Sequence, residues 1–176
     1  RTIVQQVEAM KSMVNAFSEY ARPVPLQRVT TNVNQLIIDT VDLFQAADSA
    51  HEIRTELDSE TGLIRLDPNA IRQVLNNLII NAQDALPESG GLIVVSCKVN
   101  EKQDALVIHV HDNGPGFAAQ NIERIFEPYV SSKEKGTGLG LAICRRIIEE
   151  HGGYIRAINA QEGGATVIIS LPLHQQ

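Results

Sequence analysis

The strongest constraint on the fold is a two-residue alternation of apolar side chains that returns in three separate segments. Apolar residues stand at every second position in residues 93–99, 106–110 and 167–171: Ile93, Val95, Cys97 and Val99; Leu106, Ile108 and Val110; Val167, Ile169 and Leu171. Because successive side chains of a strand point to opposite faces of a sheet, this pattern is typical of strands with one buried face. Another layer must pack on that face.

Three helical segments are predicted to form that layer. Residues 31–49 carry apolar side chains at helical spacing, and residues 68–86 begin at Asp67-Pro68, an N-cap followed by proline at the first helical position. Residues 138–151 end before Gly152-Gly153, which is typical of a helix C-terminus. Since helices and strand pairs are interspersed, we predict an α+β fold with helices on one face of a mixed or antiparallel sheet.

A further helix is predicted ahead of this fold, over residues 1–22. Its apolar residues have the four-and-three spacing of a helical bundle or coiled coil: Ile3, Val7, Met10, Val14, Phe17 and Ala21. The helix either packs on its own domain or belongs to a dimeric bundle whose partner lies outside this sequence. We favour the bundle, because Pro23 and Pro25 break the helix and mark a hinge. The expected division is 1–22, a linker over 23–30, and a globular domain over 31–176.

Charge and composition argue against several classes of protein. The 176 residues are 43% hydrophobic, which is enough for a real core. A net charge of -6 with scattered basic residues argues against a nucleic-acid partner. Cys97 and Cys144 lie in apolar segments without metal-ligand spacing, which indicates buried, reduced thiols. No apolar run reaches the roughly 18 residues that span a bilayer, so we expect a cytoplasmic chain.

Polar side chains line one face of the helix predicted over residues 68–86. Gln73, Asn77, Asn81 and Asp84 follow one another at helical spacing beside the apolar stripe. Amides one turn apart can hold a hard cation and phosphate oxygens without adding negative charge, which suits a magnesium-bound nucleotide. A solvated helix face is the plainer interpretation of the same pattern.

Two glycine-containing stretches can approach a ligand closely. Residues 112–116, Asp-Asn-Gly-Pro-Gly, follow a strand, and the carboxylate can accept a hydrogen bond from an amino group such as that of adenine. Residues 135–141 open a helix, where backbone N–H groups attract phosphate. This second stretch is neither a Walker A loop nor a dinucleotide fingerprint. Residues 163–166, Gly-Gly-Ala-Thr, are by themselves typical of a hairpin turn.

Five segments in a fixed order together resemble the catalytic, ATP-binding domain of sensor histidine kinases. They are N-L-I-I-N-A-Q-D-A from residue 77, D-N-G-P-G from 112, I-F-E-P-Y from 125, G-T-G-L-G-L from 136 and G-G-A-T from 163. The resemblance covers about residues 31 to 173, and FSEYARP and SSKEKGTGLGLA are most similar to nitrogen-regulation type sensor kinases. It implies a two-layer α/β sandwich in which ATP lies between helices under a mobile lid, with residues 1–22 as a helical bundle fragment.

The resemblance implies a role for each motif residue. Asn81 would bind Mg²⁺, Asn77 would contact phosphate or the metal's surroundings, and Asp112 would bind the adenine amino group in a pocket shaped by Gly114 and Gly116. The other implied nucleotide contacts are Asp84, Phe126, Lys133, Gly136, Thr137, Gly138, Leu139, Gly140, Leu141 and Thr166.

Three parts of this set carry specific expectations. The glycines of residues 136–140 would surround the phosphates, and residues 117–137 would form the lid. Lys133, within the lid, would join Asn77 and Asn81 as a catalytic residue by reaching the terminal phosphate. Thr166 would support a water network beside the adenine.

Position 77 distinguishes two functions within the wider fold. Type II topoisomerases, mismatch-repair ATPases and heat-shock chaperones share this fold. They carry a glutamate four residues before the metal-binding asparagine, and this glutamate acts as the general base that activates water. Asn77 stands there in this chain, and an amide cannot accept a proton at neutral pH. The resemblance therefore implies a protein-histidine kinase that uses Mg-ATP, releases ADP and serves a response-regulator receiver domain. An ATP-dependent switch or ATPase of the same fold is the alternative.

His51 resembles a phosphoacceptor but lacks its context. The family's acceptor motif is His, acid, two residues, Asn or Thr, then Pro, and Glu56 stands at the proline position. Residues 53–57 alternate as a strand, and residues 63–67 resume the alternation after a turn. We therefore predict that His51 is a surface strand residue. The acceptor helix of the homodimer is expected upstream of Arg1, so that this chain cannot autophosphorylate alone. We expect the chain to be cytoplasmic, and it can be the cytoplasmic part of a membrane-anchored sensor.

Overall fold

A five-stranded mixed sheet is the centre of the computed structural model, which describes residues 2–22, 25–130 and 138–174. Its strands are β2 (Glu52–Leu57), β4 (Leu92–Val99), β5 (Ala105–Asp112), β6 (Tyr154–Asn159) and β7 (Ala165–Pro172), in the order β2-β4-β5-β7-β6. Strands β2 and β4 are parallel, and every other pair in this sheet is antiparallel. The three strands predicted from the two-residue alternation are confirmed as β4, β5 and β7.

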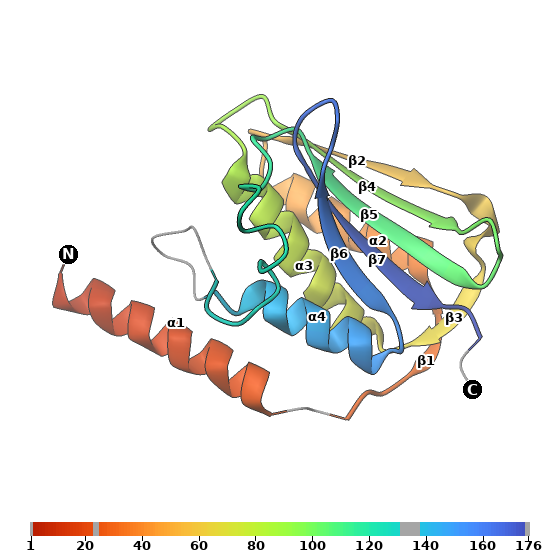
Figure 1. Cartoon of the computed structure of the whole chain (residues 1–176), viewed down its shortest axis with the longest axis horizontal. Helices are drawn as coiled ribbons and strands as arrows, with labels where there is room; N and C mark the ends of the chain where they lie inside the picture. The colour runs from red at the N-terminus through yellow and green to blue at the C-terminus, as the bar shows by residue number, and fades with distance from the viewer. Residues whose placement is uncertain (1, 23–24, 131–137, 175–176) are drawn as a thin grey trace.

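Three helices cover one face of the sheet (Figure 1): α2 (Val33–Ala47), α3 (Pro68–Ala85) and α4 (Gly140–Glu150). The alternating side chains of the strands point into this layer, where Ile93, Leu106, Ile108 and Ile169 are fully buried. Asp67 caps α3, and Pro68 is its first residue, as predicted. The predicted α+β sandwich with helices on one face is thus confirmed.

Two strands of the fold were not predicted. Strand β1 (Val29–Asn32) pairs with β3 (Leu63–Leu66) in a separate two-stranded sheet, where we expected a linker and the start of a helix. The helix α2 begins only at Val33, because the Asn32 side chain caps it by accepting from Gln35 N. Strand β6 is an edge of the main sheet, where Ile155 and Ala157 are half-buried while Tyr154 and Ile158 are exposed, so its apolar side chains do not alternate with polar ones. A short 3₁₀ helix (Ser59–Thr61) precedes β3.

Helix α1 (Ile3–Ala21) extends away from the sandwich (Figure 1). Its apolar stripe is exposed along most of its length, and only its last turns reach the domain. There Arg146 of α4 donates to the carbonyl oxygen of Tyr20 and lies over the Tyr20 ring, 5.6 Å from its centroid. Gln73 of α3 also donates to Glu19, at 3.3 Å. In the described part of the chain, no helix has the length and apolar character needed to cross a membrane.

His151 joins the end of α4 to the start of α3. Gly152 N and Gly153 N donate to the carbonyls of Glu149 and Ile148, which closes the helix with a left-handed glycine as the sequence predicts. The His151 side chain is buried; its Nδ1 lies 2.7 Å from Ile147 O, and its Nε2 accepts from Asp67 N at 3.1 Å. These partners select the neutral ring protonated on Nδ1. Burial lowers the pKa of His151 below its usual value.

Replacing His151 by leucine should remove a pH-dependent part of the stability. A histidine with a lowered pKa in the folded state contributes stability above about pH 6.5, and this contribution is lost on acidification, because the unfolded chain then binds the proton more readily. We expect His151→Leu to reduce the free energy of unfolding by about 1–3 kcal/mol at pH 7.5, because Asp67 N and Ile147 O lose their partner.

The difference between the two proteins should shrink toward about pH 5.5, as measured by urea denaturation across this range. The exposed His174 provides the control, since His174→Leu should change stability by no more than about 0.5 kcal/mol. A difference between wild type and His151→Leu that stays constant across the pH range would contradict the assignment of a neutral ring.

Candidate functional site

The polar face of α3 meets the beginning of α4. The apolar stripe of α3 is buried against the sheet, which leaves Asn77 and Asn81 half-buried at the edge of the core. Asn77 Nδ2 donates to the carbonyl oxygen of Gly140, the first residue of α4, at 3.3 Å. The structure thus brings together the asparagine helix and the glycine-rich segment. Asp84 lies two turns further along α3 and is exposed.

Asp112 occupies the end of β5, on the sheet face that the helices cover. The residue is only 6% exposed, and its carboxylate accepts from Gly114 N at 2.9 Å and from Ala165 N. Burial raises the pKa of Asp112, although these two N–H groups oppose the shift by stabilising the carboxylate. A carboxylate held in this way by two backbone donors keeps acceptor capacity for a ligand amino group.

Glycines allow three segments to close around Asp112. A Cβ atom added at Gly164 would overlap the carbonyl oxygen of Asp112, and one added at Gly114 would lie 3.0 Å from the carbonyl oxygen of Ala85 at the end of α3. Gly116 has a φ of 80°, and its added Cβ would lie 2.7 Å from Asn159 Oδ1. The turn after β5 is therefore packed between the end of α3 and the β6–β7 turn.

Asn159 is a site residue that the sequence did not reveal. Its Oδ1 accepts from Phe117 N and its Nδ2 donates to Phe117 O, both at 2.8 Å. This pair of bonds fixes the start of the predicted lid segment to the end of β6. No local pattern indicates the contact, because the two residues are 42 positions apart and β6 itself was not predicted.

The described part of the glycine-rich turn runs from Gly138 into α4. Gly138 has a φ of 70° and lies against the backbone of Tyr129, whose N–H donates to Gly138 O at 2.8 Å. Within the described ranges, α1, α2 and α3 are capped by their own Thr2, Asn32 and Asp67, whereas no side chain caps α4. Among the described residues, the first turn of α4 thus has no capping side chain. The predicted contacts Lys133, Gly136 and Thr137 lie outside the described residues.

The remaining predicted residues take three different positions. Phe126 and Leu139 are buried in the hydrophobic core, and Leu141 packs against it half-buried. Thr166 lies on β7, and its role in a water network beside the adenine stays a prediction. Thr166 pairs across the sheet with His111, and its Oγ1 lies 2.9 Å from His111 Nδ1, on the face that points away from the helices. The residue beside Asp112 is Ala165, which has no hydroxyl group.

Two buried thiols are inert, as the sequence predicts. Cys144 lies beneath α3 with its Sγ 3.9 Å from Val74 O, and Cys97 lies in β4; burial raises the pKa of each to about 12. Neither is a thiolate nucleophile at neutral pH. Among the residues with described positions, no three His, Cys, Asp or Glu side chains cluster as a metal site. A cation at this site would therefore need amide oxygens, water and ligand oxygens.

His51 differs in two respects from the residue we predicted. Strand β2 is confirmed over residues 52–57, but His51 lies just before it. Its side chain is only 11% exposed, because both ring nitrogens contact other residues, so it is not a surface histidine. A ring enclosed by such contacts is a poor phosphoacceptor, which agrees with our expectation that the acceptor is elsewhere.

Comparison with known proteins places these features in one group. Residues 66–175 match the family described as histidine kinase-, DNA gyrase B-, and HSP90-like ATPase. Sporulation kinase E of Bacillus subtilis is 34% identical over 98% of this chain and 23% of its own length. Nitrogen regulation protein NtrY of Azorhizobium caulinodans is 36% identical over 97% of this chain and 23% of its own length. The chain thus spans about a quarter of the length of these curated relatives.

A solved structure supports the same grouping. The catalytic domain of histidine kinase ThkA, in a nucleotide-free form, superposes with a TM-score of 0.75 at 33% identity, over 84% of this chain and 96% of that domain. ThkA in complex with response regulator protein TrrA superposes with a TM-score of 0.81 at 28% identity, over 98% of this chain and 49% of that one.

Alanine substitutions at the two glycines of the β6–β7 turn should distinguish the cost of backbone strain from the cost of steric overlap with Asp112. Gly163 and Gly164 have φ values of 101° and 87°, so a side chain is strained at both, but an added Cβ has open space at Gly163 and meets Asp112 O at Gly164. We expect Gly164→Ala to destabilise the protein by about 2–4 kcal/mol, and Gly163→Ala by about 1–2 kcal/mol. Chemical denaturation measures both, and equal losses would show that the turn does not press on Asp112.

Proposed function

The chain belongs to the family of histidine kinase-, DNA gyrase B- and HSP90-like ATPases, and we propose that it transfers the γ-phosphoryl group of Mg-ATP to a histidine on a separate helix. It is the catalytic domain of a two-component sensor histidine kinase, as its relatives and the ThkA domain indicate.

The observation that carries the proposal is that α3 contacts two separate parts of the proposed nucleotide site, the turn beside Asp112 and the start of α4. At one end Ala85 O lies against Gly114, beside the carboxylate of Asp112. Two turns away Asn77 contacts Gly140 at the start of α4. The rise from residue 77 to residue 85 is about 12 Å, so one helix would pass under both the adenine and the phosphates. Asp112 would accept a hydrogen bond from the adenine amino group, in a pocket shaped by Gly114 and Gly116.

The phosphate end combines a helix N-terminus with amides. The first turn of α4, which no described side chain caps, offers N–H groups and the positive end of the helix dipole to phosphate oxygens. The amide oxygens of Asn77 and Asn81 suit Mg²⁺, which keeps several waters and takes its other ligands from phosphate. We propose Asn81 as the Mg²⁺ ligand; the bound metal would neutralise charge on the transferred group. Lys133, Gly136, Thr137, Gly138 and Gly140 are proposed phosphate contacts from their motif.

Amide chemistry on α3 favours a kinase over an ATPase. Hydrolysis requires a group that takes a proton from water, and Asn77 cannot do so; its side chain is instead bonded to Gly140 O. A nucleophile delivered from another domain needs only positioning and charge stabilisation from this site. We propose that residues 1–22 are the second helix of a dimerisation segment, joined to the domain by the residues before β1, so that the exposed stripe of α1 packs in a homodimer and the acceptor histidine precedes it.

The downstream partner is proposed to be a receiver domain. ThkA was solved in complex with the response regulator TrrA, and the proposed phosphohistidine would pass its phosphoryl group to a protein of that class. Since the reaction uses ATP, we propose that this domain works in the cytoplasm.

Replacing Asp112 by asparagine should lower the affinity for ATP and reduce the preference for ATP over GTP. Asparagine exchanges a charged acceptor for an amide that also donates, so it should tolerate the guanine carbonyl where aspartate prefers the adenine amino group. We expect ATP affinity to fall by about 10- to 100-fold, the range for a hydrogen bond to a charged group, and the preference for ATP over GTP to shrink. Calorimetric titration measures both, with the exposed Asp42→Asn as control. An unchanged ratio of ATP to GTP affinity would show that Asp112 does not accept the hydrogen bond from the adenine amino group.

Phosphoryl transfer itself can be tested with two separate polypeptides. The chain is incubated with γ-labelled Mg-ATP and with a dimeric helical acceptor domain from a related kinase. We expect label on the acceptor histidine, no label on the chain alone, and at least about a 100-fold slower transfer by Asn77→Ala. Steady phosphate release that Asn77→Ala abolishes, without any labelled protein, would instead establish the alternative of an ATPase or ATP-dependent switch.

A further inference from the structure

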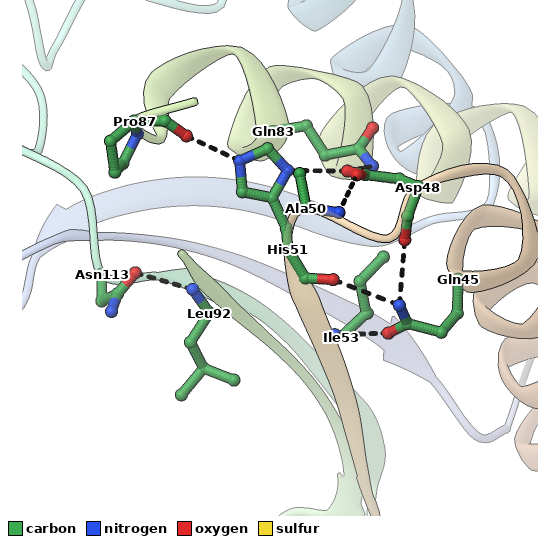
Figure 2. Close-up of polar contacts among 9 residues, drawn as sticks. All are labelled: Gln45, Asp48, Ala50, His51, Ile53, Gln83, Pro87, Leu92 and Asn113. Atoms are coloured by element: carbon green, nitrogen blue, oxygen red, sulfur yellow. Dashed lines mark hydrogen bonds and ion pairs between the residues drawn. The ribbon is translucent and has the colours of Figure 1, made fainter. Parts of the chain in front are cut away.

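A histidine–aspartate pair joins three segments beside the proposed adenine pocket (Figure 2). His51 Nδ1 lies 2.6 Å from Asp48 Oδ2, within the loop between α2 and β2. His51 Nε2 lies 2.7 Å from the carbonyl oxygen of Pro87, just after α3. Asp48 Oδ2 also accepts from Gln83 Nε2 of α3 at 2.9 Å. The pair thus holds the end of α3 at two points, Gln83 and Pro87.

The partners of His51 determine its protonation state. Asp48 Oδ2 and Pro87 O are both acceptors, whereas a neutral imidazole has only one N–H to donate. Only the imidazolium satisfies both contacts, and loss of its proton would leave a ring lone pair facing an oxygen. The pKa of His51 is raised, first by the Pro87 carbonyl and then by Asp48. The contacts therefore persist at low pH and are lost as the pH rises through this raised pKa.

The charged residues on the elements that adjoin the ring are exposed. They lie on the two elements packed around it, β2 and the end of α3 with its following turn: Glu52, Arg54, Asp84 and Glu88. Arg54 is paired with Glu52, its Nε 2.6 Å from the carboxylate. Asp48, 2.6 Å away, supplies the charge that acts on the ring.

The end of α3 that His51 holds is also a wall of the proposed pocket. Ala85, between Gln83 and Pro87, places its carbonyl oxygen against Gly114. The turn after α3 is tied to the same loop, since Gly90 N donates to Ala50 O at 3.0 Å. The next strand begins at Leu92, whose N–H donates to Asn113 Oδ1 at 2.9 Å (Figure 2). Both sides of the segment that follows Asp112 therefore depend on this loop.

We propose that His51 is a positioning residue for nucleotide binding: its imidazolium holds the end of α3 where the Asp112 pocket requires it, so nucleotide affinity decreases when the ring loses its proton. This role rests on the proposed function, because it assumes that the nucleotide binds beside Asp112. By reciprocal coupling, bound nucleotide must also make the ring hold its proton more strongly.

The test is a calorimetric titration of the chain with Mg-ADP between about pH 6 and pH 9. We expect wild-type affinity to fall about fivefold as the His51 proton is lost, at the low end of coupling between sites. His51→Gln, which is neutral at every pH, should bind at low pH as weakly as wild type does at high pH. His109→Gln is the matched control, because His109 lies half-buried on β5, facing away from the helices, and should leave the wild-type profile intact.

A second variant and a spectroscopic measurement test the same role if His51→Gln fails to fold. Asp48→Asn removes the anionic partner, so the midpoint of the affinity profile should move to lower pH. The His51 ring signals, followed by NMR, should titrate at higher pH with Mg-ADP bound than without it, which a merely structural role would not produce.

The outcomes separate this role from the function on which it rests. Binding with the same pH profile in wild type and His51→Gln, or a His51 titration that nucleotide leaves unmoved, would overturn the role and leave the proposed function standing. Failure of the wild-type chain to bind Mg-ADP at any pH would overturn both.

Discussion

Burial of the apolar stripe of α3 against the sheet is the interaction on which the rest of the site depends. Ile71, Val74 and Leu78 are almost completely buried, so the helix cannot rotate without exposing them. That orientation leaves Asn77 in contact with Gly140 and brings Ala85 O to Gly114. The two ends of the proposed nucleotide site are therefore related by the geometry of one rigid helix, and neither has to be positioned by a loop alone.

The parts of the fold that could be predicted from the sequence are those in which apolar side chains recur at regular spacing. Strands β4 and β5 alternate in burial because one face of each lies in the core, and Asp67-Pro68 marks the start of α3 through its own capping bonds. In β7 the apolar side chains at every second position gave the same signal, although its other face is buried too. Strands β1 and β6 lacked this signal, because they are short or lie at an exposed edge. Within the site, the motif did not indicate on which face of the strand each side chain lies: Ala165 pairs with Asp112, whereas Thr166 pairs with His111. Asn159 could not be found, since its contact with Phe117 exists only in the fold.

Two histidines show why the protonation states of side chains could not be predicted from the sequence either. His151 faces one donor and one acceptor, which favour its neutral ring, whereas His51 faces two acceptors, which favour its cation. Both are largely enclosed, and both tie the ends of helices to neighbouring loops. What separates them is the chemistry of partners that the chain supplies from distant positions. His51, which at first resembled a phosphoacceptor, illustrates how a short motif acquires its meaning from its surroundings.

The hydrogen bond from Tyr129 to Gly138 has a consequence for how a movement can reach α4. Gly138 has a φ of 70° and lies so close to the backbone of Tyr129 that a side chain at this position would overlap it. The two residues are therefore held together at one point directly before α4. A displacement of Tyr129 would reach the first turn of that helix through backbone contact alone, without any change within the helix.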